Sequence, residues 1–186
     1  MTELEDHLLK QINQQKDYFW HHVRFSAASE IFPKDQPISV LDIGAGAGVF
    51  GHLLKENFPQ STYSFVEPLS SLEKYLEETF GQESNKNNAK NYEFSDYIVL
   101  LDVLEHQEDD AVFLKDIVGK MSPGSKLIIT VPAMPMLWST WDEKFNHFRR
   151  YTKSSLRSSY AHLDVKEHFN SYFFIEMFLP CFFRKL

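Results

Sequence analysis

A buried strand followed by a glycine-rich turn constrains the fold of this chain more than any other feature. Residues 38–43 form a short apolar run, which is typical of a strand covered on both faces. Gly44, Gly46 and Gly48 follow this run, and an apolar stretch with helical spacing comes next. Because the first turn of a helix presents free N–H groups, this order of elements predicts a site for a carboxylate or a phosphate at the end of the strand.

The remaining sequence alternates between strand and helix patterns. Apolar runs at 62–66, 97–101 and 126–131 predict three further strands, with helical patterns between them. We therefore expect an α/β fold, a Rossmann-like three-layer sandwich with a mainly parallel sheet. Residues 1–35 are expected to form an N-terminal helical extension that acts as a lid, and residues 36–186 the ligand-binding part of a single compact domain.

Three local patterns refine this expectation. Ser70, with Glu73 three residues later, fits a capping box that starts a helix. The short polar stretch 80–96 leaves room only for a strand stub, for which Asn91–Phe94 is the candidate, and Val165–His168 is a candidate strand further on. No good final strand is recognisable after it, so the sequence leaves open whether the last strand of such a sheet is missing.

Charge and composition narrow the kind of partner and the compartment. The net charge is −7 and no basic run is longer than a pair such as Arg149-Arg150, which argues against a nucleic acid as the main partner. The single cysteine, Cys181, fits a reducing compartment. The acidic first residues do not resemble a signal peptide, and no apolar run approaches the ~20 residues that span a bilayer. We expect a cytoplasmic protein.

Two classes of ligand compete for the glycine-rich turn. Gly46, Gly48 and Gly51 satisfy the G-x-G-x-x-G spacing of dinucleotide sites, which would suit an NAD-dependent oxidoreductase. Asp42 favours a different ligand, because a carboxylate just before the first glycine repels a pyrophosphate and can pair with the ammonium group of an amino-acid ligand. A third interpretation is a non-catalytic binding protein whose pocket has decayed.

Glu67 ends the second predicted strand and supports a ligand without choosing between these classes. A carboxylate in this place can accept hydrogen bonds from both ribose hydroxyls of a nucleoside. The alternative is a solvated acid at the end of a strand.

Three segments of the chain resemble the motifs of class I S-adenosylmethionine (SAM)-dependent methyltransferases. The Asp-x-Gly-x-Gly-x-Gly pattern at 42–48 resembles their first motif, and residues 96–106 resemble the segment of their fourth strand. Residues 121–125 resemble the Pro-Gly turn before their fifth strand. The resemblance covers about residues 38–132. It implies a SAM-dependent methyltransferase with SAM as cofactor and S-adenosylhomocysteine (SAH) as product.

The same resemblance implies which residues surround the cofactor. The loop after the family's fourth strand lies along the methionine part of SAM, and the other positions follow from the first motif and the second strand. The implied cofactor residues are Asp42, Gly44, Ala45, Gly46, Gly48, Glu67, Pro68, Asp102, Val103 and Leu104. The shortened region before Asp96 departs from the family, so the contact with adenine is not assigned.

The segment after the last clear strand resembles a subgroup of small bacterial methyltransferases. Its pattern is His147-x-Arg149-Arg150-Tyr151-Thr152, preceded by Trp138 and Asp142. The subgroup also carries an N-terminal aromatic–Trp…Arg signature, matched here by Trp20 and Arg24. The implied acceptor is a small molecule or a lipid- or saccharide-linked compound, and the acceptor itself stays open.

These residues supply candidates for the acceptor side. His147 is the candidate catalytic base, because imidazole exchanges a proton near neutral pH. An arginine in this segment can hold an anionic group in a bidentate grip. The candidate substrate-binding residues are Trp20, Arg24, His106, Trp138, Arg150 and Tyr151. The alternative for each is a structural role in covering the core.

We expect no metal site from the sequence. His7, His21 and His22 match no ligand spacing, and His147 with Asp142 supplies too few ligands.

The aromatic C-terminal segment 172–186 has three open interpretations. It is either a helix that covers the core, a membrane-surface anchor, or an interface for a second copy of the chain. Peripheral membrane contact or a homodimer through this segment follows from the last two.

Overall fold

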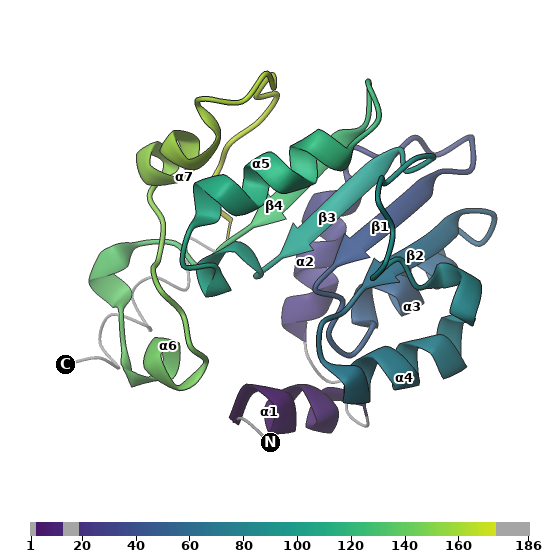
Figure 1. Cartoon of the computed structure of the whole chain (residues 1–186), viewed down its shortest axis with the longest axis horizontal. Coiled ribbons are helices and arrows are strands. Elements are labelled where there is room, and N and C mark those ends of the chain that lie inside the picture. Colours follow the sequence, from purple (N-terminus) through teal and green to yellow (C-terminus); the bar gives the residue numbers. More distant parts are fainter. Residues whose placement is uncertain (1–2, 13–18, 174–186) are drawn as a thin grey trace. The chain divides into compact units, whose positions relative to one another are not determined.

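Four parallel strands form the sheet of this chain. The structure is a computed structural model that describes residues 3–12 and 19–173. In the order β2-β1-β3-β4 across the sheet, the strands are β1 (Ser39–Ile43), β2 (Thr62–Val66), β3 (Tyr97–Leu101) and β4 (Lys126–Thr130) (Figure 1). The chain moves outward in opposite directions from β1, so the carboxyl ends of β1 and β3 lie at a topological switch point, where such sheets bind ligands. The predicted Rossmann-like α/β class with a parallel sheet is confirmed.

Helices lie before β1 and between the strands, as the sequence predicts, whereas α6 and the three short 3-10 helices were not predicted. In chain order the helices are α1 (Glu3–Ile12), α2 (Phe19–Ser29), α3 (Val49–Asn57), α4 (Ser70–Phe80), η1 (Gln82–Ser84), η2 (Leu104–His106), α5 (Asp110–Lys120), η3 (Pro135–Leu137), α6 (Thr140–Lys144) and α7 (Lys153–Tyr160). Asp109 caps the start of α5, since its carboxylate accepts a hydrogen bond from the N–H of Val112 at 2.9 Å.

The chain divides into two compact units. The first runs as far as Val103 and includes Lys120–Thr130, so it holds the whole sheet with α1 to α4. The second consists of Leu104–Gly119 and the residues from Val131 onward. The N-terminal helices fall in the same unit as the sheet. The division after residue 35, predicted within a single compact domain, stays a prediction.

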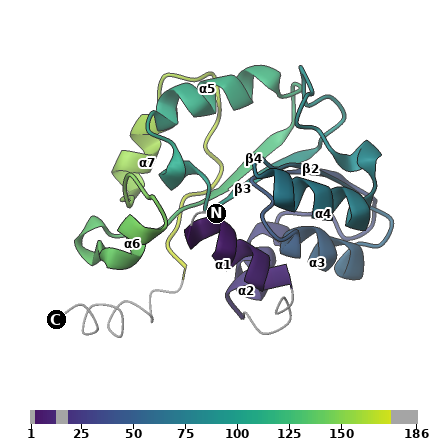
Figure 2. The same cartoon turned by 60° about the horizontal axis from the view of Figure 1, so that its bottom comes forward.

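An aromatic core explains why α2 belongs to the first unit. In that unit α2 and α3 lie side by side against one face of the sheet (Figure 2). Phe25 of α2 packs on Phe50 of α3, with ring centroids 5.2 Å apart. Phe32, just after α2, packs on Tyr97 of β3 with centroids 4.6 Å apart. Burial of such large side chains supplies most of the favourable free energy of folding, so the extension is included in the core.

The start of α4 differs from the sequence prediction. The helix does begin at Ser70, but Leu69 is its N-cap residue and no side chain caps it, so the predicted capping box of Ser70 with Glu73 is wrong. The physical reason lies one turn earlier. The Glu67 carboxylate accepts a hydrogen bond from the N–H of Leu69 at 2.9 Å and thereby satisfies a donor at the start of this helix.

The strand stub after α4 also lies elsewhere than predicted. Asn85 forms a parallel bridge with Phe65 beside β2, whereas Tyr92, in the middle of the predicted stub Asn91–Phe94, bridges Met121 instead. The Asn85 amide donates to Glu73 and to Glu77 of α4, both at 2.8 Å. These bonds turn the chain back to β2 directly after η1, so the sheet edge is occupied before residue 91.

The candidate strand at Val165–His168 is not a strand. Glu167 instead binds the guanidinium of Arg157 on α7 and the hydroxyl of Tyr160. These side-chain bonds hold the segment against α7 without a ladder of backbone hydrogen bonds. The described residues contain four strands in all, and none of them follows β4.

Most of the aromatic C-terminal segment lies outside the described residues, which end at Phe173. The three interpretations of that segment therefore stay predictions. None of the helices in the described ranges is long and apolar enough to cross a membrane.

Two helical glycines provide a matched test of the packing between α3 and the sheet. A Cβ at Gly51 would lie 2.6 Å from the Tyr63 ring and 2.8 Å from the Phe80 ring, whereas a Cβ at Gly119 of α5 would meet nothing within 4 Å. We expect Gly51→Ala to lower the free energy of unfolding by about 1–3 kcal/mol through overpacking. Gly119→Ala should leave it unchanged or raise it by up to about 1 kcal/mol. Urea unfolding followed by circular dichroism measures both, and equal stabilities would contradict the packing.

Candidate active site

The loop after β1 owes its shape to three glycines. Gly44, Gly46 and Gly48 have φ values of 76°, 55° and 72°, in the left-handed region that other residues enter at a cost. The N–H groups of Gly44 and Ala45 donate to the Val66 carbonyl at 2.8 and 3.3 Å. The loop is therefore tied to the end of β2.

The Glu67 carboxylate supports this loop through hydrogen bonds. One carboxylate oxygen accepts a hydrogen bond from the N–H of Gly46 at 2.8 Å, and the other accepts from the N–H of Leu69. Its side chain is buried, and burial raises the pKa of Glu67 although the two N–H groups lower it. The neighbouring Pro68, also a predicted cofactor residue, is exposed. Glu67 thus stands at the end of β2, where a cofactor residue was predicted, and already supports the loop.

Asp42 is fully enclosed beneath the loop. The hydroxyl of Tyr63 donates to its carboxylate at 3.0 Å, and 3% of the residue is exposed. Burial raises the pKa of Asp42 to about 7, and the nearby charge of Glu67 adds to the shift. Pairing of Asp42 with the ammonium group of a ligand stays a prediction, because its structural partner is Tyr63.

Asp102 joins the ends of β3 and β4 to α2. Its N–H donates to the Thr130 carbonyl and its carboxylate accepts from the Thr130 hydroxyl, each at 3.0 Å. The other carboxylate oxygen forms an ion pair with Arg24 at 3.0 Å. Asp102 has a φ of 56°, a conformation in which non-glycine residues are uncommon and which gathers at functional sites. The adjacent Val103 packs so close to Gly44 that a Cβ there would meet it at 2.6 Å.

The N-terminal signature residues Trp20 and Arg24 meet at the carboxyl end of β3. The Arg24 guanidinium lies 5.4 Å from the centre of the Trp20 ring, within the range of a cation–π contact. Among the described residues, its buried Nε has no hydrogen-bond partner. Burial and the Arg24 charge lower the pKa of His21 to about 4, so this neighbouring ring is neutral at pH 7. A charged group with one buried N–H donor, unpaired among the described residues, thus lies at the end of β3.

Helix α1 covers the glycine loop. A Cβ at Gly46 would lie 3.3 Å from the Leu8 side chain, and the Ser71 hydroxyl at the start of α4 donates to Glu5 at 2.8 Å. Both helices of the extension therefore reach the carboxyl ends of the strands (Figure 1). His147 and Arg150 belong to the second unit, so a lid over the acceptor residues stays a prediction.

In the second unit, the buried carboxylate of Asp142 organises the predicted acceptor residues. Arg150 grips it with Nε at 2.7 Å and with a second nitrogen at 2.9 Å. His147 Nδ1 lies 3.0 Å from its Oδ1, and Ser139 completes a capping box with it at the start of α6. Burial raises the pKa of Asp142, but these partners outweigh burial and hold it below its usual value. The bidentate grip that we predicted for a substrate is made to Asp142.

The other predicted acceptor residues also have partners within the second unit. The Tyr151 hydroxyl donates to Asp110 at 2.9 Å, and the Trp138 ring N–H donates to Glu143 at 3.3 Å. His106 packs edge to face against His147, with ring centroids 4.7 Å apart. The structure thus brings His106, His147 and Arg150 together, while contact of any of them with a substrate stays a prediction.

Sequence reasoning missed three residues that position the predicted ones. Tyr63 supports Asp42, Thr130 supports Asp102 and Leu8 covers Gly46. Thr130 carries a usable signal, since it is a polar residue that closes an otherwise apolar strand. Tyr63 and Leu8 look like ordinary core residues in the sequence, and only the tertiary contacts distinguish them.

Comparison with known proteins agrees with this geometry. The family described as "Methyltransferase domain" matches residues 14–165. The chain therefore belongs to the methyltransferase domain family, which confirms the enzyme class predicted from the three motifs. No curated protein matches the sequence significantly.

Solved structures share the fold at low sequence identity. A chain of the complex between the Haloferax volcanii Trm112 methyltransferase activator and a methyltransferase is 13% identical, with a TM-score of 0.68 over 87% of this chain and 75% of that one. The plantazolicin methyltransferase BpumL, in complex with a desmethylPZN analog and SAH, is 15% identical, with a TM-score of 0.62 over 84% and 68%. An O-methyltransferase family protein of Burkholderia thailandensis is 14% identical, with a TM-score of 0.59 over 76% and 50%.

The titration of Asp42 makes a testable prediction. Its pKa is raised in the folded state from 3.8 to about 7, so folding binds a proton. The stability that this group contributes is full below pH 4 and is lost as the pH rises through 7. We expect Asp42→Asn to gain stability relative to the native chain between pH 5 and pH 8, by on the order of 2 kcal/mol. Urea unfolding at both pH values measures this gain, and a constant difference would show that Asp42 does not titrate there.

Proposed function

We propose that this chain transfers the methyl group of SAM to a nucleophilic acceptor. The observation that carries the proposal is the pair of opposite charges at the end of β3. Arg24 and Asp102 form an ion pair in which a terminal guanidinium nitrogen lies 3.0 Å from Asp102 Oδ2. Arg24 has a buried Nε–H that can donate to a carboxylate, and the Asp102 anion can pair with an ammonium group. The amino-acid end of SAM carries these two groups side by side.

The residues at the ends of β1 and β2 fit the remaining portions of the cofactor. The glycine loop has no Cβ atoms where its three left-handed residues turn, so a ligand can approach its backbone closely. Glu67 uses one lone pair of each carboxylate oxygen for the loop and for Leu69. A carboxylate has about four acceptor positions, so two are left for ribose hydroxyls. SAM supplies an electrophilic methyl group on a sulfonium, and these residues bind and orient it.

The charge of the site favours SAM over a dinucleotide. Three acids, Asp42, Glu67 and Asp102, lie at or just after the ends of three adjacent strands. The carboxylate of Glu67 disfavours a pyrophosphate there, while Asp102 is already ion-paired and Asp42 is enclosed beneath the loop. The third glycine of the G-x-G-x-x-G pattern also has a different explanation. Gly51 is required by the close packing of α3 against Tyr63. An NAD-dependent oxidoreductase and a binding protein with a decayed pocket are therefore the weaker alternatives.

For the acceptor side we propose a small molecule or a lipid- or saccharide-linked compound. The Asp142 carboxylate fixes His147 through Nδ1, which leaves Nε2 as the ring atom that can accept a proton from a hydroxyl. The plantazolicin methyltransferase BpumL, which shares this fold, is solved in complex with a desmethylPZN analog and SAH, and this supports the proposal. A cytoplasmic location and contact of residues 174–186 with a membrane or a second copy also belong to the proposal.

The choice of cofactor is tested by thermal unfolding with SAM, SAH or NAD. A ligand present at 100 times its dissociation constant stabilises the fold by about 2.7 kcal/mol. We expect SAM and SAH to raise the melting temperature and NAD to leave it unchanged. Stabilisation by NAD alone would support the oxidoreductase, and no response to any ligand at millimolar concentration would support a decayed pocket.

Removal of the Glu67 carboxylate gives a second test. Glu67→Ala loses the support of the glycine loop and the acceptors for ribose, so we expect SAH binding to weaken by about 1.5–3 kcal/mol, roughly 10- to 150-fold. Isothermal titration calorimetry measures the dissociation constant. Glu56→Ala, an exposed acid on the helix that follows the loop, is the control and should bind SAH normally. A folded Glu67→Ala chain with an unchanged constant would remove Glu67 from the cofactor site.

A further inference from the structure

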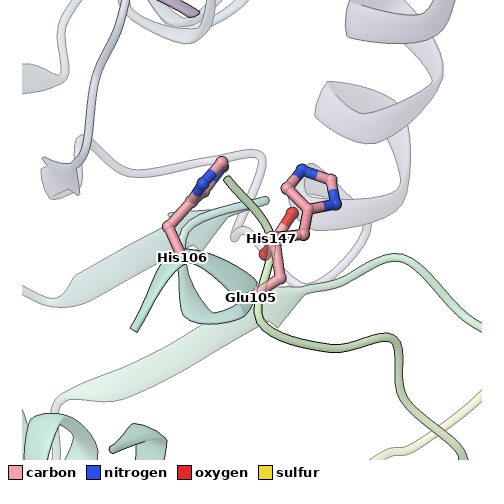
Figure 3. A group of neighbouring side chains, drawn as sticks. All are labelled: Glu105, His106 and His147. Atoms are coloured by element: carbon pink, nitrogen blue, oxygen red, sulfur yellow. The ribbon is translucent and has the colours of Figure 1, made fainter. Parts of the chain in front are cut away.

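Three metal-ligating side chains come together in the second unit, from two separate segments. Glu105 and His106 belong to η2, and His147 lies in the loop between α6 and α7. Figure 3 shows the three side chains directed toward a common space. Each offers one ligand atom, and these three atoms all lie within 4.8 Å of one another.

Backbone and side-chain bonds fix the two segments to each other. The N–H of Phe148, next to His147, donates to the Glu105 carbonyl at 2.8 Å. The Tyr151 hydroxyl, which donates to Asp110, also lies 3.3 Å from the Leu104 carbonyl oxygen. Arg149 forms an ion pair with Asp110 at the start of α5 at 3.1 Å. These contacts hold the two segments together without using the three ligand atoms.

The surroundings of His147 are those of a metal ligand. Metal-bound histidines usually bond a carboxylate through their other ring nitrogen, which fixes the ring and makes it a stronger ligand. Asp142 is completely buried and makes this bond to Nδ1 of His147, so Nε2 is the remaining ligand atom. Arg150 in turn fixes Asp142 with two bonds. Arg150 and Asp142 therefore fix the ring of His147 and the direction of its Nε2.

Glu105 adds the negative charge that such a site requires. It is 1% exposed, so little water competes with a cation for its carboxylate. His106 is half-buried, and its ring lies edge to face with His147. Two imidazoles with one carboxylate are a ligand set typical of zinc and of other divalent transition metals.

We propose that Glu105, His106 and His147 bind one divalent transition-metal ion of the Zn²⁺ class. Tetrahedral ligands at about 2.1 Å from such an ion are about 3.4 Å apart, so the three ligand atoms, which lie within 4.8 Å of one another, would draw together around the ion. Three protein ligands leave a fourth position for water or for an oxygen of the acceptor. Metal binding itself does not depend on the proposed methyl transfer.

The proposal changes the role of His147 in the proposed function. A nitrogen that coordinates a metal cannot also accept a proton, so ligation and base catalysis by Nε2 exclude each other. With the ion in place, a hydroxyl bound at the fourth position loses its proton more readily because the ion lowers its pKa.

The test is a titration of the chelator-treated full chain with Co²⁺, which reports tetrahedral coordination by visible absorption, and with Zn²⁺ in competition. We expect one ion per chain. His106→Ala and His147→Ala should each weaken binding at least tenfold. His162→Ala, an exposed histidine of the same unit, should bind like the native chain. Glu105→Gln keeps the shape of the buried side chain and should also weaken binding, with circular dichroism as the check on folding.

Three outcomes would overturn the site. They are no binding at stoichiometric metal, binding that both histidine variants retain, or equal losses in His162→Ala. SAH binding measured on the same samples keeps this result separate from the cofactor. A chain that binds SAH but no metal loses only the metal site, and one that binds metal but no SAH loses only the proposed function.

Discussion

The bond between the Glu67 carboxylate and the glycine loop is the interaction on which the cofactor side of the structure depends. One acidic side chain satisfies a backbone donor of the loop and another at the start of α4, so two connections of the sheet share a single support. Burial strengthens both bonds, since the competing water is absent. The three left-handed glycines can hold their turn because this support and the Val66 carbonyl hold the backbone on either side.

At the neighbouring strand end, Asp102 has a corresponding role. It closes the ends of β3 and β4 through Thr130 and draws in α2 through Arg24, so a helix from the N-terminus joins the site. The Asp142 carboxylate does the same for the segment that follows β4. In all three places a buried or half-buried acid organises the backbone around it, and the ligand-facing geometry is a consequence of those bonds.

The sequence predicted the strands and main helices, which follow from repeating patterns of apolar residues. The site lies at the carboxyl ends of the strands because the fold class dictates it. The sequence missed features that depend on individual tertiary contacts. The capping box at Ser70 failed because Glu67, outside the helix, already satisfies a donor there. The stub at Asn91–Phe94 failed because Asn85 reaches the sheet edge first. Glu105 was overlooked because its approach to His147 joins segments that are far apart in the sequence.

The contacts of the segment after β4 have a consequence for how such enzymes diversify. Arg150, His147 and Ser139 all bond Asp142, and Tyr151 and Arg149 bond residues at the start of α5. These bonds stay within one unit of the chain, so the segment carries its own scaffold. Mutations inside it can remodel the surface of this segment while the glycine loop and its support stay unchanged. A common ancestor can in this way give rise to enzymes that share a cofactor and differ in what they modify.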